Sequence, residues 1–439
     1  MDSTLQYKLE ERVAHRPLNI QPLICSLLFL AIFAGCQGGR YYMSNRLQEL
    51  GIFSALLLMS LGAWRAVFQL NLDNLKDWVL KPVCLIFGIM LISSMAFYVN
   101  YGGNPLYSFF SAREFMLAFV GPGVYLLCRT GLPVRVVETT VRFALVALML
   151  NYLFFYFTLD LKSLFFSTDH TLSNLVTYDD WRGFRLKPPL FAIMVGLMAA
   201  FIGVGQARTF MSWAISLSVM GIAIYIWSIV MFRSTLATMA MAMLLYPALF
   251  ASKNRIPLVV VMSPLLILSI PVGFDMMLDV FLGSDGGGLR KQSFELAFQQ
   301  IPGHLIFGAG EDNAYGATYQ DIVGPYFFPD DIGFIGTLYK YGVVGAFLYL
   351  YMHIKIWSRL WAANIQFKKI YGRLNPQLWA IFMWLTAMAF NLVLNPGLAY
   401  AQGITLASIG FALASLHLNE NGYAASITTS SRVASQLET

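Results

Sequence analysis

The chain has 439 residues, of which 58% are hydrophobic and only 12% are charged. A soluble domain is about 25% charged, so this composition excludes an ordinary soluble protein and indicates one that spans a membrane. The net charge of +6 lies mostly in short connections between apolar runs, so we attribute it to membrane topology and expect no nucleic-acid partner.

The apolar runs are near the length that an α-helix needs to cross about 30 Å of hydrocarbon, so helices are expected and barrel strands are not. We predict an all-α polytopic membrane protein with about twelve transmembrane helices. In chain order they cover residues 19–37, 50–70, 78–99, 109–128, 136–158, 188–206, 210–231, 234–252, 256–274, 332–356, 376–395 and 399–417.

Basic residues in the connections indicate the orientation. With the N-terminus inside, nearly every basic connection stays in the cytoplasm, as the positive-inside tendency requires. The first span has a long apolar core and is expected to stay attached. The expected organisation is an N-terminal cytoplasmic tail (1–18), spans one to nine (19–274), a large periplasmic loop (275–331), spans ten to twelve (332–417) and a C-terminal cytoplasmic tail (418–439). This topology places the chain in the bacterial inner membrane.

Cysteine and histidine residues give no sign of a bound group. The four cysteines lie within or beside predicted spans without paired spacing, and the five histidines lack metal-ligand spacing. Phosphate-binding and dinucleotide-binding motifs are also absent from the sequence. We therefore expect neither a metal nor another cofactor.

Two external arginines are candidates for binding an anion. Arg233 begins the eighth predicted span, and Arg290 follows a run of three glycines at the start of the amphipathic segment RKQSFELAFQQI. The planar guanidinium suits a diphosphate because it donates two parallel hydrogen bonds. An interfacial anchor is the alternative for Arg233. The helix that begins at Arg290 is expected to lie on the membrane surface or to cap a cavity.

Two adjacent acids, Asp330 and Asp331, precede the tenth predicted span. Asp331 has the position of a helix N-cap, and it is also a candidate general base, since the two roles are compatible. Adjacent acids on an extended segment point in opposite directions, so the pair does not suggest a metal site.

Over about residues 180–345, these features resemble the O-antigen ligase and polymerase superfamily, the Wzy-like integral membrane glycosyltransferases. That family opens a span after its first large external loop with a glycine followed by a proline. The residues here that fall in this pattern are Arg182, Gly183, Arg185, Pro188 and Ala192, while Pro189 stands where asparagine is common.

Other motifs extend the resemblance. Arg233 is similar to the family's arginine at an outer helix start, and Arg290 precedes a turn, Gly308 to Gly310, that is similar to the family's GxG turn. The family then places a histidine eleven residues before a glycine, and that spacing leads from Gly342 back to Asp331. Because the histidine is the family's base, its replacement leaves three candidates, Asp331, Asp330 and His304. The replacement also favours a polymerase over a ligase.

The resemblance implies a GT-C-like architecture and glycosyl transfer at the periplasmic face. The donor would be an undecaprenyl-diphosphate-linked chain, and the acceptor would be a sugar hydroxyl on a second lipid-linked repeat unit, for exopolysaccharide or O-antigen synthesis. External arginines would stabilise the leaving diphosphate without a metal. A flippase, a chain-length regulator and membrane lipid are the implied partners.

The resemblance also assigns roles to residues. Catalysis is assigned to Asp331, Arg290 and Arg233, and substrate binding to Arg182, Arg185, Asp330, His304, Gly308 and Gly310. The alternatives are an O-antigen ligase of the same superfamily and a polysaccharide-lipid flippase or transporter. A transporter should place its charges on span faces towards a central cavity, whereas a polymerase should concentrate them in external loops.

Overall fold

The computed structural model describes residues 20–42, 46–173, 175–179, 183–230, 287–312, 317–392 and 397–437. In these residues the chain is nearly all helical, and six helices are long and apolar enough to cross a membrane. The prediction of a helical membrane protein is confirmed at this level. The eighth and ninth predicted spans, with Arg233, lie outside the described residues, so twelve spans, the orientation and the periplasmic loop remain predictions.

The long apolar segments are built from continuous or nearly continuous helices. They are α3 (Arg46–Gln69), α4 (Leu72–Leu75) with η2 (Lys76–Leu80) and α5 (Lys81–Tyr101), α8 (Val134–Thr158), α12 (Phe210–Val230), η5 (Pro329–Ile332) with α17 (Gly333–Tyr371), and α19 (Ala401–Leu437). Three shorter apolar helices are α2 (Gln21–Gly35), α11 (Leu190–Gln206) and α18 (Pro376–Phe390).

The fourth predicted span, 109–128, is not one continuous α-helix. It consists of α6 (Pro105–Ser111), the 3₁₀ helix η3 (Ala112–Phe119) and α7 (Val120–Arg129). The side chain of Asn104 caps α6 by accepting a hydrogen bond from the N–H of Leu106. Runs of 3₁₀ helix longer than three or four residues are uncommon, and in the middle of a helix they often mark a functional position.

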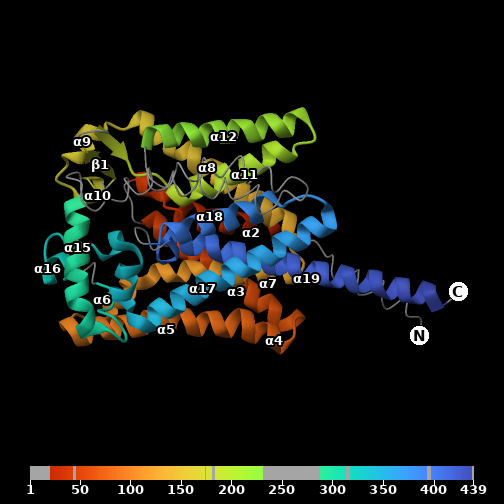
Figure 1. Ribbon diagram of the computed structural model, residues 1–439, viewed down its shortest axis with the longest axis horizontal. Coiled ribbons are helices and arrows are strands. Elements are labelled where there is room, and N and C mark those ends of the chain that lie inside the picture. The colour runs from red at the N-terminus through yellow and green to blue at the C-terminus, as the bar shows by residue number, and fades with distance from the viewer. Residues whose placement is uncertain are drawn as a thin grey trace, which may run out of the picture.

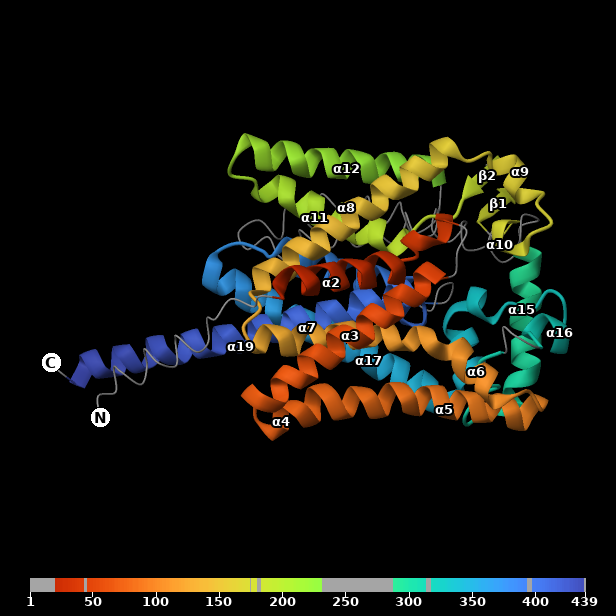
Figure 2. The ribbon, with the colours of Figure 1, turned by 180° about the vertical axis from the view of Figure 1, so that it is seen from behind.

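Most long helices run roughly along the long axis of the molecule, and the shorter elements gather at one end (Figure 1). We call this the loop end. It holds α6, α9 (Leu161–Phe165), α10 (His170–Ser173), strands β1 (Val176–Asp179) and β2 (Gly183–Leu186), α15 (Gly287–Gln300) and α16 (Tyr319–Ile322). The view from behind shows α15 lying across this end of the bundle, while α4 and the C-terminal part of α19 lie at the other end (Figure 2). The remaining short elements are η1 (Gly38–Tyr42), η4 (Ile301–His304) and η6 (Gly397–Ala399).

The hairpin of β1 and β2 is a departure from the all-α prediction. Its strands are antiparallel, and Val176 pairs with Leu186. Strand β1 reads Val-Thr-Tyr-Asp, and β-branched and aromatic residues favour extended backbone. The ring of Tyr178 packs on that of Phe184 with centroids 4.7 Å apart. The hairpin lies in the connection between the fifth and sixth predicted spans.

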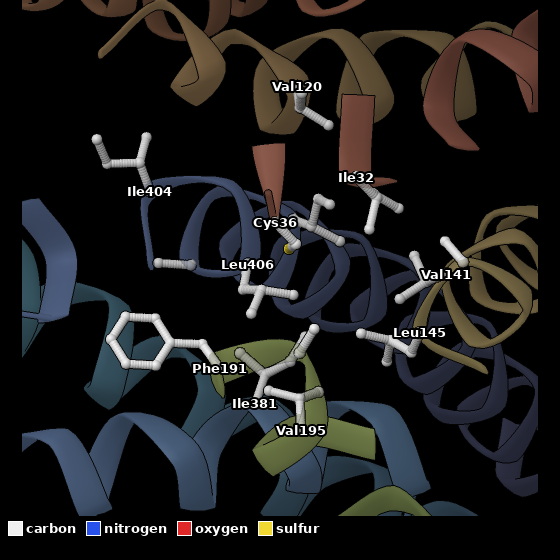
Figure 3. Packing of buried hydrophobic residues seen from close by; sticks show 14 of the residues in the cluster. Ile32, Cys36, Val120, Val141, Leu145, Phe191, Val195, Ile381, Ile404 and Leu406 are labelled. Carbon is white, nitrogen blue, oxygen red and sulfur yellow. The ribbon is translucent and has the colours of Figure 1, made fainter. Parts of the chain in front are cut away.

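The main hydrophobic core joins helices that are distant in sequence (Figure 3). Ile32 and Cys36 come from the region of α2, Val141 from α8, Val195 from α11 and Ile381 from α18, and all are buried. Cys36 is a free thiol that fills space in this core. The packed helices therefore provide a rigid base for the segments at the loop end.

Candidate functional site at the loop end

The site begins at a break in α17. Gly342 adopts φ 65° and ψ −170°, a conformation that interrupts the helix and that glycine adopts without strain. The break frees the carbonyl groups of Tyr339 and Lys340 from their helical partners. They accept hydrogen bonds instead from the N–H groups of Ala309 (2.8 Å) and Gly310 (2.9 Å).

The hydrogen bonding across this break is reciprocal. The N–H of Val343 donates to the carbonyl of Leu305 at 2.8 Å, and that of Val344 donates to Ile306 at 3.3 Å. The predicted glycine turn is thus a backbone partner of α17, and Gly308 has φ 77°, which favours glycine. The turn holds Glu311 and the first turns of α17 together.

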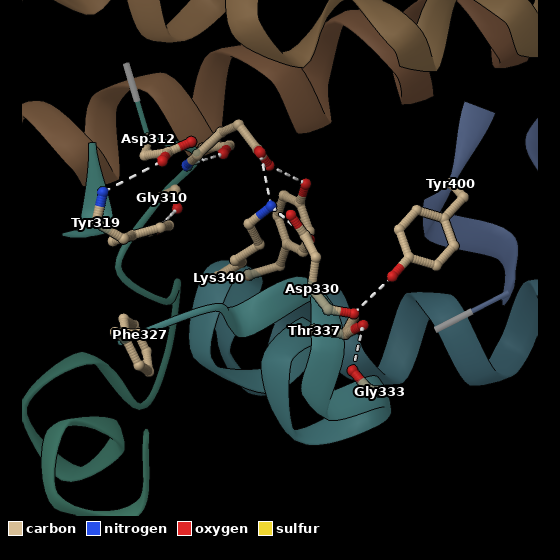
Figure 4. A network of polar contacts seen from close by, with 12 residues as sticks. Gly310, Asp312, Tyr319, Phe327, Asp330, Gly333, Thr337, Lys340 and Tyr400 are labelled. Carbon is tan, nitrogen blue, oxygen red and sulfur yellow. Dashed lines mark hydrogen bonds and ion pairs between the residues drawn. The ribbon is translucent and has the colours of Figure 1, made fainter. Parts of the chain in front are cut away.

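A buried ammonium group forms the centre of the site (Figure 4). The Nζ atom of Lys340 lies 2.6 Å from Oε1 of Glu311 and 2.8 Å from Oδ1 of Asp330, and its side chain is 8% exposed. The hydroxyl of Tyr341 also donates to Glu311. Desolvation raises the pKa of Glu311, and the Lys340 charge opposes that shift. One cation therefore holds two carboxylates from different segments.

The two adjacent aspartates lie in η5 and have different surroundings. Asp330 contacts Lys340 through its carboxylate, and its carbonyl accepts a hydrogen bond from the Tyr400 hydroxyl at 2.6 Å. Asp331 is exposed. The charged groups near it are the cations Arg290 and Lys187 and the carboxylate of Asp330. The prediction that Asp331 caps the following helix is wrong, because the N-cap of α17 is Ile332.

Arg290 lies in helix α15, so the prediction that this segment is helical is confirmed. Ala297 of α15 and the following Ile301 are buried, and α15 packs against η5 and α17. The buried Ser293 hydroxyl donates to the carbonyl of Tyr326 at 2.9 Å and accepts from the N–H of Phe328 at 3.1 Å. Ser293 therefore fixes the segment that leads to Asp330 and Asp331 relative to α15.

Two further basic residues, Lys187 and Arg40, belong to the cluster. Lys187 follows β2, and its backbone carbonyl accepts a hydrogen bond from the Tyr41 hydroxyl at 2.7 Å. Desolvation lowers the pKa of Lys187, with a further contribution from Arg40, while Asp331 opposes the shift. Desolvation also lowers the pKa of Arg40, and Tyr41 and Glu114 oppose that shift. Among the described residues, no carboxylate lies within 4.0 Å of the basic groups of Arg40, Lys187 or Arg290.

The turn that carries Arg40 is held by several hydrogen bonds. The side-chain amide of Asn151 donates to the carbonyl of Gly38 at 2.9 Å and accepts from the Tyr42 hydroxyl at 2.8 Å. Gln402 donates to the side chain of Gln37 at 3.1 Å. Gln37 itself has φ 62°, an uncommon conformation for a residue other than glycine. These contacts fix the position of η1 against α8 and α19.

Two other predicted site residues, Arg185 and His304, have partners outside the Lys340 network. Arg185 is buried and donates to the carbonyl of Val230 at 3.0 Å, at the end of α12. The ring of His304 lies among tyrosines, with its Nε2 atom 3.4 Å from the hydroxyl of Tyr101. Desolvation lowers the pKa of His304. Arg182 and Arg233 lie outside the described residues.

Sequence reasoning placed Arg40 among the external arginines without a specific role, and it missed other members of the cluster: Lys340, Glu311, Lys187, Glu114 and Tyr400. Lys340 and Glu114 lie inside predicted spans, where a charge without a partner is costly. Their positions in the sequence therefore indicated buried, partnered charges. The remaining residues are brought to the site by tertiary contacts. In the described part of the chain, no group of three or more metal-binding side chains occurs.

No protein-family model matches this chain, and no curated protein sequence matches it significantly.

Proposed function

We propose that the chain is a glycosyltransferase that polymerises undecaprenyl-diphosphate-linked oligosaccharide repeat units at the periplasmic face of the inner membrane. The observation that carries the proposal is that Asp331 lies near the charges of Arg290 and Lys187 at one end of an apolar helical bundle. A carboxylate beside cations without carboxylate partners among the described residues suits a reaction that takes a proton and releases an anion. The sequence resemblance supports the same reaction class.

In the proposed mechanism Asp331 is the general base. Asp330 is less suitable because Lys340 binds its carboxylate, and His304 is less suitable because its ring packs among tyrosines. Asp331 takes the proton of the acceptor hydroxyl while the acceptor oxygen attacks the anomeric carbon of the donor. The lipid diphosphate leaves with the electron pair of the broken bond, and Arg290 stabilises its charge.

The same arrangement agrees with a lipid substrate. The polyprenyl tail would stay among the apolar helices, and the sugars would lie at the loop end beneath α15. The charged cluster lies at one end of the bundle, which supports an enzyme over a transporter. A ligase would share this site and differ in the acceptor. The flippase and the chain-length regulator belong to the same proposal as partners.

The test uses purified protein in lipid nanodiscs with a lipid-diphosphate-linked repeat unit, with EDTA present and chain length as the readout. Wild type is expected to make longer chains, whereas Arg290→Ala and Asp331→Asn should lower the rate by about 100-fold or more. Lys291→Gln is the matched control, because this neighbouring cation is exposed and pairs with Glu295 at 4.0 Å. Movement of the intact substrate between leaflets without extension would replace the enzyme by a flippase.

A further inference from the structure

Glu114 is a carboxyl group of the cluster that the mechanism above does not use. It lies in η3, the eight-residue 3₁₀ helix between α6 and α7. Phe115 packs edge-on against the ring of Tyr341, with centroids 5.8 Å apart, so η3 adjoins the Lys340 network. Because the interruption of the α-helix lies beside the charged cluster, it places Glu114 where the chemistry is proposed.

The direct partner of Glu114 is neutral. The side-chain amide of Gln48 from α3 donates to its Oε1 atom. The adjacent cation is engaged elsewhere, because Arg113 binds Glu49 at 2.7 Å and donates to the carbonyl of Phe110 at 2.7 Å. Glu114 therefore has an amide hydrogen bond where its neighbour Glu49 has an ion pair.

The charged groups that act on Glu114 come from η3 itself and from two other elements. They are Arg113 of η3, Asp330 of η5 and Arg40 of η1. Helices α2, α5, α7 and α19 pack against η3 as well, and no charged group of theirs is among the strongest influences on Glu114 in the described part of the chain.

We propose that Glu114 is a second catalytic residue, the acid that delivers a proton to the departing diphosphate beside Arg40. This inference rests on the proposed glycosyl transfer. The bond between the anomeric carbon and the diphosphate oxygen breaks, its electron pair stays on that oxygen, and the oxygen takes the proton of Glu114. The acceptor oxygen forms the new bond, and its proton passes to Asp331. Water then returns one proton from Asp331 to Glu114, so both groups regain their starting states.

The structure provides a reason for two carboxyl groups with opposite tasks. Asp331 has the cations Lys187 and Arg290 near it, whereas Glu114 has a neutral direct partner. Pairs of acids in different surroundings are a common basis for acid and base roles. The two carboxyl groups come from different elements, η5 and η3.

The experiment measures kcat/KM for chain extension across acidic to alkaline pH, with the lipid-diphosphate-linked repeat unit as substrate. Wild type should lose activity on the alkaline side as Glu114 ionises. Glu114→Gln preserves the shape of the side chain and is expected to lower kcat by about 100-fold to 10,000-fold and to remove the alkaline limb. Glu114→Asp should retain the limb with partial activity. A Glu114→Gln enzyme that keeps both its rate and its alkaline limb would overturn the inference.

Two further variants keep the test independent of folding. Glu49→Gln removes the neighbouring carboxylate of α3 and should leave the pH profile unchanged. Gln48→Leu removes the hydrogen bond that favours ionised Glu114, so the alkaline limb should move to higher pH. If Asp331→Asn is inactive while Glu114→Gln behaves as wild type, the inference fails and the proposed function stands. If wild type extends no substrate, the proposed function itself fails.

Discussion

Gly308 and Gly342 lie so close together that a side chain on either would collide with the backbone of the other. A Cβ atom added to Gly308 would lie 2.5 Å from the nitrogen of Gly342, and one added to Gly342 would lie 2.5 Å from the nitrogen of Gly308. Both residues also have positive φ, at 77° and 65°. The glycine turn and the broken helix therefore require each other.

Replacement of either glycine by alanine should destabilise the loop end. Gly308→Ala and Gly342→Ala each place a side chain in left-handed backbone, which costs about 1–3 kcal/mol before the collision is counted. Thermal unfolding of the purified protein is expected to show a lower Tm for both. Gly303→Ala is the matched control, because a Cβ atom there would have no neighbour within 4 Å. Equal Tm values for all three variants would contradict this account.

Removal of the buried ammonium alone should be more costly than its removal together with the Glu311 carboxylate. Lys340→Met leaves Glu311 and Asp330 without their shared cation, and breaking a buried ion pair costs about 3–5 kcal/mol. The double variant Lys340→Met with Glu311→Gln should regain part of this loss. Chemical denaturation of the single and double variants measures the difference, and an equally unstable double variant would argue against the ion pair.

The two adjacent aspartates should separate stability from activity. Asp330→Asn weakens the contact with Lys340 and is expected to lower Tm with a smaller effect on chain extension. Asp331→Asn should leave Tm nearly unchanged and lower the rate of extension strongly, because Asp331 is exposed and is the proposed base. Measuring Tm and initial rate for both variants checks this. The reverse pattern would transfer the base role to Asp330.

Loss of the Ser293 hydroxyl should disturb the position of η5. The hydroxyl bridges Tyr326 and Phe328, and leaving these backbone groups without it costs about 1–3 kcal/mol. Ser293→Ala is therefore expected to lower both Tm and the rate of extension. Gln292→Ala, at an exposed neighbouring position, serves as the control. A normal rate in the serine variant would show that η5 is held without this bridge.

His304 should affect the pH dependence of stability and have little effect on catalysis. Desolvation holds its pKa below the ordinary value of 6.5 in the folded protein, so the unfolded chain takes up the proton first as the pH falls. The folded state therefore loses stability as the pH decreases through that value. His304→Gln should flatten this part of a plot of Tm against pH and retain most activity. A loss of about 100-fold in rate would instead indicate a base.

Composition and periodicity predicted the class of the molecule well. The apolar runs indicated a helical membrane protein, and the segment from Arg290 is helical with Ala297 buried. These features depend on local pattern, which the sequence displays directly. The hairpin of β1 and β2 was missed because its strands have only four residues each, too few for a clear alternation.

The site could be predicted only in part. Arg290 and Asp331 were found from spacing, and the structure places their charges near each other. The N-cap assignment for Asp331 failed because a 3₁₀ turn precedes α17 and moves the helix start by one residue. Lys340 and Glu114 were overlooked because their carboxylate and amide partners come from segments remote in the chain. Such contacts follow from tertiary packing, which local pattern does not specify.

The exchange of backbone hydrogen bonds at Gly342 has a mechanical consequence. The part of α17 before the break is bonded to the turn at 305–310, so it belongs to the same rigid block as that turn and η5. Lys340, Asp330 and Glu311 keep their mutual geometry inside this block. Arg40 and Glu114 belong to η1 and η3, outside this block. Movement of η1 and η3 relative to the block would therefore leave the ion pairs of Lys340 unbroken.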